Sequence, residues 1–389
     1  MSQDLVQSKE PLLREVSSSG SGRDITRPFI ASSNLLAPQD TVLQSRGGDY
    51  ALYEDLLRDD QVASTFQQRR LAVTSAEWGV LPGDDRKDSH KAAEHLNEML
   101  VKINWDSVTD KMLYGLFYGF GVGECIWERQ GGRIELKELV VRKQRRFAFD
   151  SEGRLILRLV NDHQGELLPE KKFWHFSAGA DNDDEPYGLG LAHWLYWPVY
   201  FKRNGIKMWS IFMDKFGMPT AKGSYPANAT EEEKQRLLSA LRAIQTDSGI
   251  IVPDGMQVEL IEAARGGNIS YEVFLDRMNG AIAKVVLSQT MTTEAAGGQY
   301  KSEVQKSIRD EVLRRDAKLL SNSFNATVAK WLTSWNYPDA ATPRVWRNIV
   351  NEKDLRPRAE RDKILFDMGF RPSLAYIQET YGEGWQEKE

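Results

Sequence analysis

The sequence contains a single cysteine, Cys125, among its 389 residues. One thiol cannot close a disulfide within the chain, and it cannot provide the several cysteine ligands of a structural zinc site. A lone cysteine is typical of a protein that works in a reducing, intracellular environment. Cys125 also lies in a segment of alternating pattern, which favours a small buried side chain over a reactive thiol.

Long apolar segments are also missing. The most apolar stretch, residues 189–201, is interrupted by Pro198 and followed at once by Lys202 and Arg203. It falls short of the ~20 apolar residues that span a bilayer. Residues 1–10 are polar and acidic where a secretion signal needs an apolar run. We expect a protein that stays inside the cell that makes it and has no membrane partner.

Positive charge is not in excess. The chain has 51 lysines and arginines against 56 aspartates and glutamates, a net charge of −5, which excludes a basic protein that binds nucleic acid through bulk charge. Its 41% of apolar residues is ordinary for a globular protein, and its length suggests two or three domains. Residues 1–40 differ, because their serine- and glycine-rich run at 17–22 predicts a flexible N-terminal arm.

Familiar catalytic motifs are absent as well. The sequence has no G-x-S-x-G, H-E-x-x-H or Walker A pattern, and its five histidines lack the spacing of metal ligands. The segment Gly297–Ser302 resembles a phosphate-binding loop, but it lacks a glycine directly before Lys301 and follows an expected helix rather than a strand. We therefore expect no catalytic residue, no bound metal and no cofactor.

An acidic cluster allows two interpretations. It consists of Asp181, Asp183, Asp184 and Glu185, and clustered oxygens of this kind can hold a metal ion. Pro186 stands where a calcium-binding loop needs glycine. We favour a solvated acidic turn before the next helix.

A basic cluster also has two interpretations. It consists of Arg142, Lys143, Arg145 and Arg146, and Phe147 and Phe149 follow it. Basic residues beside aromatic rings can bind the backbone and stack the bases of nucleic acid. Lysine and arginine also protect exposed strand edges from aggregation, and we favour this second interpretation.

The apolar periodicity predicts an α+β fold that is mainly helical. Residues 50–68, 89–102 and 105–120 have helical spacing, and the segments that follow them alternate with a period of two. The expected strands are 122–127, 136–141, 146–149, 155–160 and 173–176. These segments form a first α+β region.

The middle of the chain has a different character. Residues 188–216 predict one helix about 42 Å long. It carries an aromatic stripe, which we interpret as core or subunit packing rather than a stacking platform for bases. The stripe residues are Trp194, Trp197, Phe201, Trp209, Phe212 and Phe216.

A compact insert and further helices follow. The insert has a helix that Thr230 caps and that runs to Ala243. The strands expected around it are 221–225, 250–252 and 258–261. The later segments are a helix at 271–291, a glycine-containing loop at 292–300, a helix at 301–335 and a helical C-terminal region.

Several short motifs occur together in one order. They are Pro186–Leu191, Trp197-Pro198, Phe201-Lys202, Gly217–Pro219, Gly249–Pro253, Gly255-Met256 and Leu287–Thr292. In this combination the sequence resembles the portal proteins of Mu-like tailed phages and prophages, over roughly residues 50–337. Ser288 and Met291 stand where that family usually has glycine and leucine.

The resemblance implies a portal fold, in which copies of the chain form a dodecameric ring at one vertex of the capsid. The regions of this fold are called wing, stem, clip and crown. The implied regions are a flexible arm at 1–40, the wing at 41–187, a stem helix at 188–216, the clip at 217–268, a returning stem helix at 269–291, the tunnel loop at 292–300, a long wing helix at 301–336 and the crown at 337–389.

The resemblance also implies partners. Double-stranded DNA passes through the channel, the terminase large subunit and then a head-tail connector protein dock at the clip, and the major capsid protein is a further partner. The implied DNA-facing residues are Thr292, Thr293, Glu294, Ala295, Ala296, Gly297, Gly298, Gln299 and Tyr300. The implied clip contacts are Lys222, Tyr225, Glu231, Glu232 and Lys234. The aromatic stripe would pack in the stem or between subunits.

Three functions are therefore open. The leading one is a structural conduit of the virion that assembles in the host cytoplasm and has no enzymatic activity. The second is another capsid-associated scaffold or adaptor. The third is a DNA-processing enzyme whose metal is held by Asp181, Asp183, Asp184 and Glu185.

Overall fold

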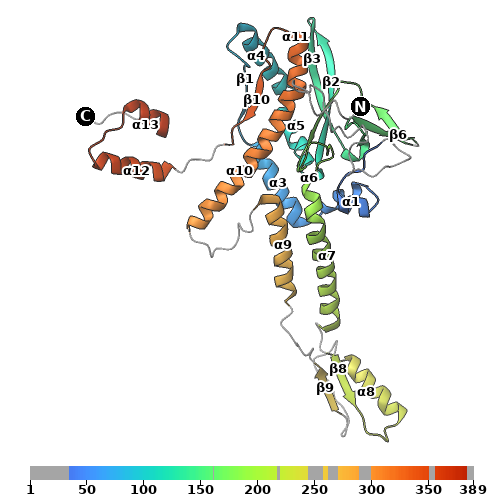
Figure 1. The fold of residues 1–389 in the computed structure, drawn as a ribbon. Coiled ribbons are helices and arrows are strands. Elements are labelled where there is room, and N and C mark those ends of the chain that lie inside the picture. The colour runs from blue at the N-terminus through green and yellow to red at the C-terminus, as the bar shows by residue number, and fades with distance from the viewer. Residues whose placement is uncertain are drawn as a thin grey trace, which may run out of the picture. The chain divides into compact units, whose positions relative to one another are not determined.

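The computed structural model describes residues 35–160, 162–216, 220–243, 257–261, 270–288, 299–349 and 355–382 (Figure 1). The chain divides into two compact units. The first unit comprises the residues up to His193 and from Val286 onwards, and the second comprises Trp194–Val285. In the sequence, the second unit is an insertion within the first.

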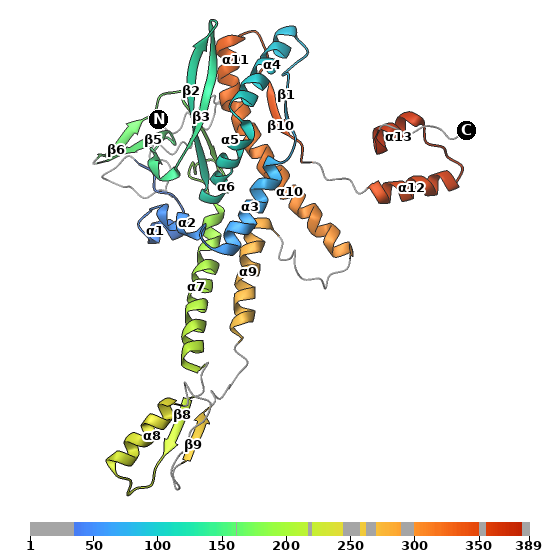
Figure 2. The same ribbon diagram turned by 180° about the vertical axis from the view of Figure 1, so that it is seen from behind.

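The first unit is an α+β structure. Its elements include the strands β2 (Phe120–Gln130), β3 (Arg133–Arg142) and β7 (Phe173–Ser177) and the helices α3 (Asp60–Thr74), α4 (Lys87–Lys102), α5 (Trp105–Met112) and α10 (Gln299–Phe324). The three strands form an antiparallel sheet in the order β3-β2-β7. Helices α4, α5 and α10 pack on this sheet, and α3 lies beside α10 in both opposite views (Figure 2).

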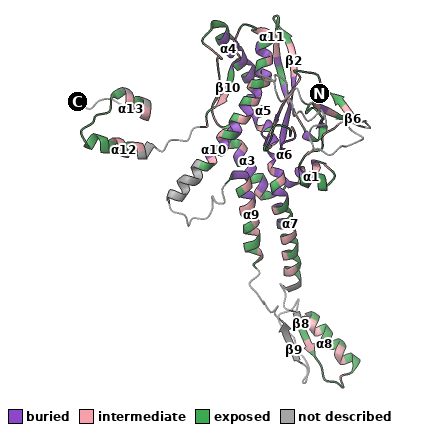
Figure 3. Cartoon of the chain, viewed as in Figure 1, coloured by how far each residue is buried: buried purple, intermediate pink, exposed green. Residues whose placement is uncertain are grey.

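Aromatic residues fill the centre of the first unit. Trp105 of α5 and Trp174 of β7 stack with ring centroids 5.8 Å apart, and the ring of Phe324 lies 4.6 Å from that of Trp105. None of the three is more than 1% exposed. Figure 3 shows the same concentration of buried residues where α5 and α10 face the sheet. We call these three residues the buried aromatic cluster.

The helix expected at 50–68 is in fact two helices, α2 (Ala51–Leu56) and α3. The Asp59 carboxylate accepts hydrogen bonds from the backbone N–H groups of Gln61 and Val62, at 3.0 and 3.1 Å. An aspartate in this position starts a new helix, because it satisfies two of the free N–H groups of the first turn. The shorter helix α1 (Thr41–Ser45) begins in the same way at Asp40.

The helix expected at 105–120 is also divided. It consists of α5 and a short α6 (Tyr114–Tyr118), and β2 begins at Phe120. Gly119 has a φ of +104°, which glycine adopts far more readily than other residues, and it ends α6. The alternating segment at 122–127 therefore lies in a strand, as the sequence predicts.

A second small sheet has the strand order β4-β5-β6. Its strands are β4 (Phe147–Phe149), β5 (Leu155–Leu159) and β6 (Asp162–Leu167). The first two were expected from the sequence, although residues Gln144–Arg146 form a 3₁₀ turn and β4 starts only at Phe147. Strand β6 was not expected from the sequence, because its polar residues lack an apolar alternation.

The C-terminal region is not entirely helical, and this corrects the expectation for residues 337–389. Strand β10 (Arg344–Arg347) pairs antiparallel with β1 (Trp78–Leu81), which the sequence analysis also missed. The Arg347 guanidinium donates to the carbonyl groups of Thr74 and Ala76 at the end of α3, at 3.2 and 3.1 Å. The helices α12 (Leu355–Asp367) and α13 (Leu374–Tyr381) follow.

The long helix predicted at 301–335 is confirmed as a continuous helical run. It consists of α10, a π-helical turn at Asn325–Ala329 and α11 (Lys330–Asn336). The Asn325 side chain bonds both the N–H and the carbonyl of Val345, at 2.9 and 3.0 Å. The π turn thus lies where α10 binds β10.

The second unit contains the greater part of helix α7 (Leu191–Phe216), the greater part of helix α9 (Tyr271–Leu287) and a small α/β region. Within this unit a Cβ added to Gly205 would lie 2.6 Å from the Phe274 ring, so glycine lets α9 approach α7 closely. In the α/β part, β8 (Thr220–Ser224) pairs antiparallel with β9 (Gln257–Ile261), and α8 (Glu231–Ala243) packs on β8. The strand expected at 250–252 lies outside the described residues.

The cap predicted for α8 is confirmed. The Thr230 hydroxyl accepts from the Glu233 N–H at 3.3 Å, and the Glu233 carboxylate accepts from the Thr230 N–H at 2.8 Å. This reciprocal capping box satisfies two N–H groups at the start of the helix. None of the helices within the described ranges has the length and hydropathy of a membrane span.

Candidate functional site

Helix α7 carries a group of exposed aromatic side chains within the second unit. Trp194, Trp197, Tyr200 and Phe201 are 57%, 49%, 43% and 48% exposed. The rings of Trp197 and Phe201 stack with centroids 5.8 Å apart, and Tyr200 meets both edge-on. Contiguous exposed apolar surface of this kind marks interaction sites, and aromatic residues are enriched at the centres of interfaces. We call these four residues the α7 aromatic patch.

The other residues of the predicted stripe have different surroundings. Trp209 stacks on Tyr271 of α9, with centroids 6.3 Å apart and ring planes 5° from parallel. Phe212 lies 5.8 Å from the same Tyr271 ring. These two side chains therefore pack between α7 and α9 of one chain. The side chain of Phe216 lies outside the described residues.

Three of the five predicted clip residues form a cluster at the start of α8. The Lys234 ammonium bonds the Glu231 carboxylate at 2.7 Å and lies 5.3 Å from the centre of the Tyr225 ring. The hydrogen bond that Lys234 donates to Glu231 raises the pKa of the Lys234 ammonium. Tyr225 is 51% exposed, and Lys222 and Glu232 are exposed as well. The cluster thus offers both charges and an aromatic ring to a partner.

The predicted tunnel loop is only partly described. Residues 292–298 lie outside the described residues. Gln299 and Tyr300, which the sequence analysis assigned to the loop, belong to the first turn of α10. The loop prediction is wrong for these two residues, because the glycine pair that signals the turn ends one position earlier.

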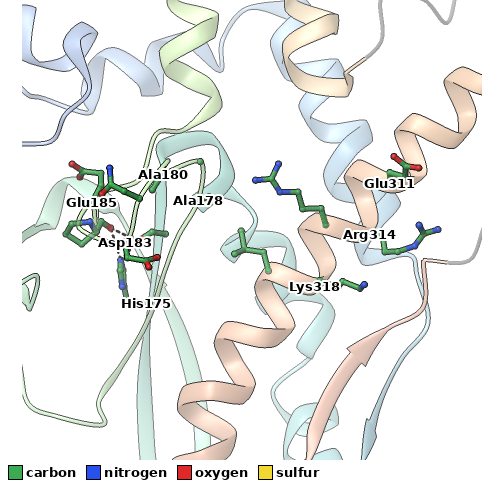
Figure 4. Close-up of a pocket in the computed structure, with 14 residues that line it drawn as sticks. His175, Ala178, Ala180, Asp183, Glu185, Glu311, Arg314 and Lys318 are labelled. Atoms are coloured by element: carbon green, nitrogen blue, oxygen red, sulfur yellow. Dashed lines mark hydrogen bonds between the residues drawn. The ribbon is translucent and has the colours of Figure 1, made fainter. Parts of the chain in front are cut away.

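An open cleft of about 770 Å³ lies in the first unit between the acidic turn and α10 (Figure 4). One wall comes from β7 and the turn after it, with His175, Asp183 and Glu185. The opposite wall comes from α10, whose lining residues are Glu311, Arg314, Arg315, Lys318 and Leu319. The two walls therefore carry mainly opposite charge.

Ser177 and His175 in this cleft resemble a nucleophile and its base, but both bond the carbonyl oxygen of Pro186 more closely than they bond each other. The Ser177 hydroxyl donates to the Pro186 carbonyl at 2.6 Å, and His175 Nε2 lies 3.2 Å from the same oxygen. To bond a carbonyl, Nε2 must carry a proton, and it then cannot accept one from Ser177. Burial lowers the pKa of His175 to about 4. Both side chains therefore stabilise the turn that contains Pro186.

The acidic cluster is an exposed turn with one buried carboxylate rather than a set of ligands around an ion. Asp181, Asp183 and Asp184 are exposed, whereas Glu185 is buried and accepts from the Tyr187 N–H at 3.1 Å. Over the described part of the chain, no group of three or more histidine, cysteine or carboxylate side chains has a geometry that could hold a metal. These side chains therefore give no support to a metal-dependent enzyme.

Three of the four residues of the basic cluster form ion pairs within the chain, among them Arg145 with Asp49 at 3.1 Å. Arg142 bonds Glu124 at 2.7 Å, and Lys143 bonds Glu54 at 3.1 Å. The aromatic residues beside it, Phe147 and Phe149, are buried and cannot stack on bases. Cys125 is also fully buried, and burial raises the pKa of its thiol to about 12, as a structural cysteine requires.

A sequence profile of the family described as the portal protein of Mu bacteriophage matches residues 50–383. The chain belongs to this family. Two curated relatives support the assignment. The Mu-like prophage FluMu protein gp29 of Haemophilus influenzae is 28% identical over 326 residues, which cover 81% of this chain and 62% of the relative. The portal protein of Escherichia phage Mu is 30% identical over 291 residues, which cover 72% and 56%.

This member of the Mu portal family spans about three fifths of the length of the curated relatives it matches. Solved structures share its fold. A chain in the neck of an empty gene transfer agent (GTA) particle has a TM-score of 0.59 at 13% identity, and the match covers 88% of this chain and 94% of that chain. A chain in the virion of a native GTA particle has a TM-score of 0.57 at 13% identity, with 85% and 93% covered.

The motif Pro186–Leu191, which is part of the resemblance to the portal family, has a clear structural role. A Cβ on Gly188 would lie 2.2 Å from the Gly119 carbonyl oxygen, and one on Gly190 would lie 2.2 Å from that of Phe117. The Tyr187 hydroxyl donates to the Leu36 carbonyl at 2.9 Å. The two glycines thus let the chain cross the end of α6 closely just before α7 begins.

Two residues of this portal-family chain were missed by the sequence analysis. Tyr271 organises the contact with Trp209 and Phe212, and its place in the first turn of a predicted helix beside an aromatic-rich one was an available signal. Arg69 forms a buried ion pair with Asp316. No local pattern in the sequence connects these two positions.

Proposed function

We propose that this chain is the subunit of a portal: a ring of copies, twelve by the family resemblance, at one vertex of a phage capsid. Membership of the Mu portal family supports the proposal. The single observation that carries it is the α7 aromatic patch, because exposed aromatic surface of this kind marks a site that binds a partner. Further copies of the chain are that partner.

The regions of the proposed portal follow the elements of the chain. The wing comprises residues 41–187 together with α10 and α11, the stem comprises α7 and α9, and the clip comprises 217–268 with β8, α8 and β9. Residues from 355 onwards form the crown, whereas β10 belongs to the wing because it pairs with β1. Terminase, and later a head-tail connector protein, dock at Tyr225, Glu231 and Lys234 of the clip.

The proposed channel carries double-stranded DNA past residues 292–300. Residues 295–298 are two alanines and two glycines, and glycine places the fewest steric limits on backbone conformation. The net charge of −5 suits a conduit, since each neutralised phosphate would add affinity and slow the DNA. The role is structural, and the energy for packaging comes from the motor. The ring is a component of the virion and assembles in the host cytoplasm.

The first test is the mass and image of the purified protein. We expect a particle near twelve times the chain mass of 44.3 kDa, with an open axial channel in negative-stain images. A stable monomer under all conditions would refute the ring. A closed assembly without a channel would instead favour a scaffold or adaptor.

The second test concerns DNA. Deleting residues 295–298, which lie before α10, should leave the ring mass unchanged and reduce the number of DNA-filled particles. A matched control replaces the same four residues with a four-residue glycine-serine segment, which keeps the length. Loss of the ring in the deletion variant would show that this segment acts in assembly rather than on DNA.

A further inference from the structure

Arg69 of α3 makes a buried ion pair with Asp316 of α10. Its Nε and Nη2 donate to the two carboxylate oxygens of Asp316, at 2.7 and 2.9 Å. Arg69 is 8% exposed and Asp316 is 3% exposed. The pair therefore has the planar, two-bond geometry of a strong arginine–carboxylate contact and holds two helices together away from water.

The third bond of Arg69 goes to another element. Its Nη1 donates to the carbonyl oxygen of Val286 at 2.5 Å. Val286 lies in the last turn of α9, which ends at Leu287, and Ser288 then takes a φ of +57°. Carbonyl groups in the last turn of a helix lack partners within it and carry partial negative charge, so a guanidinium there satisfies and stabilises the helix end.

Stability alone does not account for this arrangement. Two apolar side chains in place of a buried ion pair are often as stable as the pair or more so. They cannot, however, donate a hydrogen bond to the Val286 carbonyl. The arginine is needed where the end of α9 must be held at one position relative to α3 and α10.

We propose that Arg69 is a positioning residue, which fixes the C-terminal end of α9 to α3 and α10 through one guanidinium. Val286 is the residue at which the chain returns from the second unit to the first. In this role Arg69 fixes the position of Val286, two residues before the end of the described chain that follows α9. The consequence for DNA rests on the proposed function, in which residues 292–300 face the channel.

The adjacent residue supplies a matched control. Arg70 pairs with Asp110, and its guanidinium lies 4.4 Å from the centre of the Tyr114 ring. The Arg70 side chain contacts Asp110, Tyr114 and Phe66, and none of these three residues belongs to α9. Arg70→Met with Asp110→Leu thus removes an ion pair from the same helix and leaves the bond to Val286 intact.

The first experiment measures hydrogen exchange on the purified full-length protein. In Arg69→Met with Asp316→Leu, we expect amides of residues 280–288 to exchange at least tenfold faster, with a melting temperature close to that of the wild type. The Arg70→Met/Asp110→Leu control should exchange like the wild type over the same residues. Equal exchange in all three proteins would overturn the proposal.

A conservative variant keeps the test decisive if the double variant does not fold. Arg69→Lys retains the charge but cannot make all three bonds, because an ammonium lacks the planar fork of a guanidinium. We expect its exchange over residues 280–288 to rise threefold to tenfold. Unchanged exchange in Arg69→Lys would also overturn the proposal.

The second experiment separates this inference from the proposed function. The Arg69→Lys chain replaces the wild-type chain in phage particles, and ring mass and DNA-filled particles are counted. We expect an unchanged ring and at least a threefold loss of filled particles. If Arg69→Lys exchanges faster but the particles contain as much DNA as wild-type particles, Arg69 has no role in DNA packaging. If the wild-type protein forms no ring, the proposed function is refuted, but the result of the exchange experiment still holds.

Discussion

The two aromatic groups of this protein use the same side chains in opposite ways. In the buried aromatic cluster of the first unit, Trp105 is 1% exposed, whereas Trp197 in the α7 aromatic patch of the second unit is 49% exposed. Each large aromatic side chain that is buried removes ~150–250 Å² from water. In the buried aromatic cluster, folding has already removed this apolar surface from water and so stabilises the first unit. In the α7 aromatic patch, the surface that is still exposed can be removed from water only when the chain binds a partner.

The largest effect is expected in the buried aromatic cluster. Trp174→Ala should lower the free energy of unfolding by about 3–5 kcal/mol, because it leaves a cavity among close-packed rings. It also removes the donor to the Ser323 hydroxyl, at 3.0 Å. Denaturant unfolding of the purified chain measures this loss. Ser323→Ala is the control, with an expected loss of ~1 kcal/mol, and a loss below 1 kcal/mol in Trp174→Ala would contradict the assigned packing.

For the α7 aromatic patch, we expect little change in folding stability and a clear loss of association between chains. Trp197→Ala with Phe201→Ala should change the stability of the isolated chain by no more than ~0.5 kcal/mol and weaken each subunit contact by ~2 kcal/mol or more. Native mass measurement over a dilution series compares the proposed ring in this variant and in the wild type. Leu71→Ala, an exposed apolar position of the first unit, is the control. A ring that persists to the same dilution would remove the patch from the interface.

An intermediate effect is expected between α7 and α9. In a double-mutant cycle, Trp209→Ala and Tyr271→Ala should show a coupling energy of about 0.5–1.5 kcal/mol, since the two rings stack within one chain. Trp197→Ala and Tyr271→Ala form the reference cycle, for which we expect no coupling. Additive effects of Trp209 and Tyr271 would mean that their stacking contributes nothing to folding.

The smallest effect concerns pH. Burial lowers the pKa of His175 to about 4, below the ~6.5 of an unfolded histidine. The unfolded chain therefore binds a proton first, and stability present above pH 6.5 is lost as the pH falls towards 4. The loss should be on the order of 1 kcal/mol, because the ring lines an open cleft and water reduces the penalty. Urea unfolding from pH 7 to 4.5 measures the slope.

His175→Asn should flatten this slope, and His90→Asn should not. His90 is exposed on α4 and is a matched change of residue type. An identical pH dependence in the wild type and His175→Asn would assign the loss of stability to other groups.

Local features of the fold could be read from the sequence. Thr230 and Glu233 stand three residues apart before an apolar helical pattern, and they form the capping box of α8. The alternating segment around Cys125 lies in β2. The turn at 186–190, which belongs to one of the motifs behind the family resemblance, comes directly before α7. In each case the cause lies within a few residues, where patterns of spacing carry information.

Features that depend on distant partners could not be predicted. Strand β1 has four residues, and its partner β10 lies near the other end of the chain. The pair of Arg69 and Asp316 likewise joins two helices whose bonded residues are 247 positions apart in the sequence. Within the aromatic stripe, periodicity treated Trp197 and Trp209 alike, because it contains no information on which part of α7 is covered by Tyr271.

The pairing of β1 with β10 also has a consequence for protein synthesis. A ribosome adds about 5–20 residues per second, so β1 waits roughly ten to fifty seconds for its partner strand. The whole second unit, with the α7 aromatic patch, emerges during that interval. The exposed aromatic side chains of α7 are therefore present on the nascent chain before β1 can pair with β10 and complete the first unit.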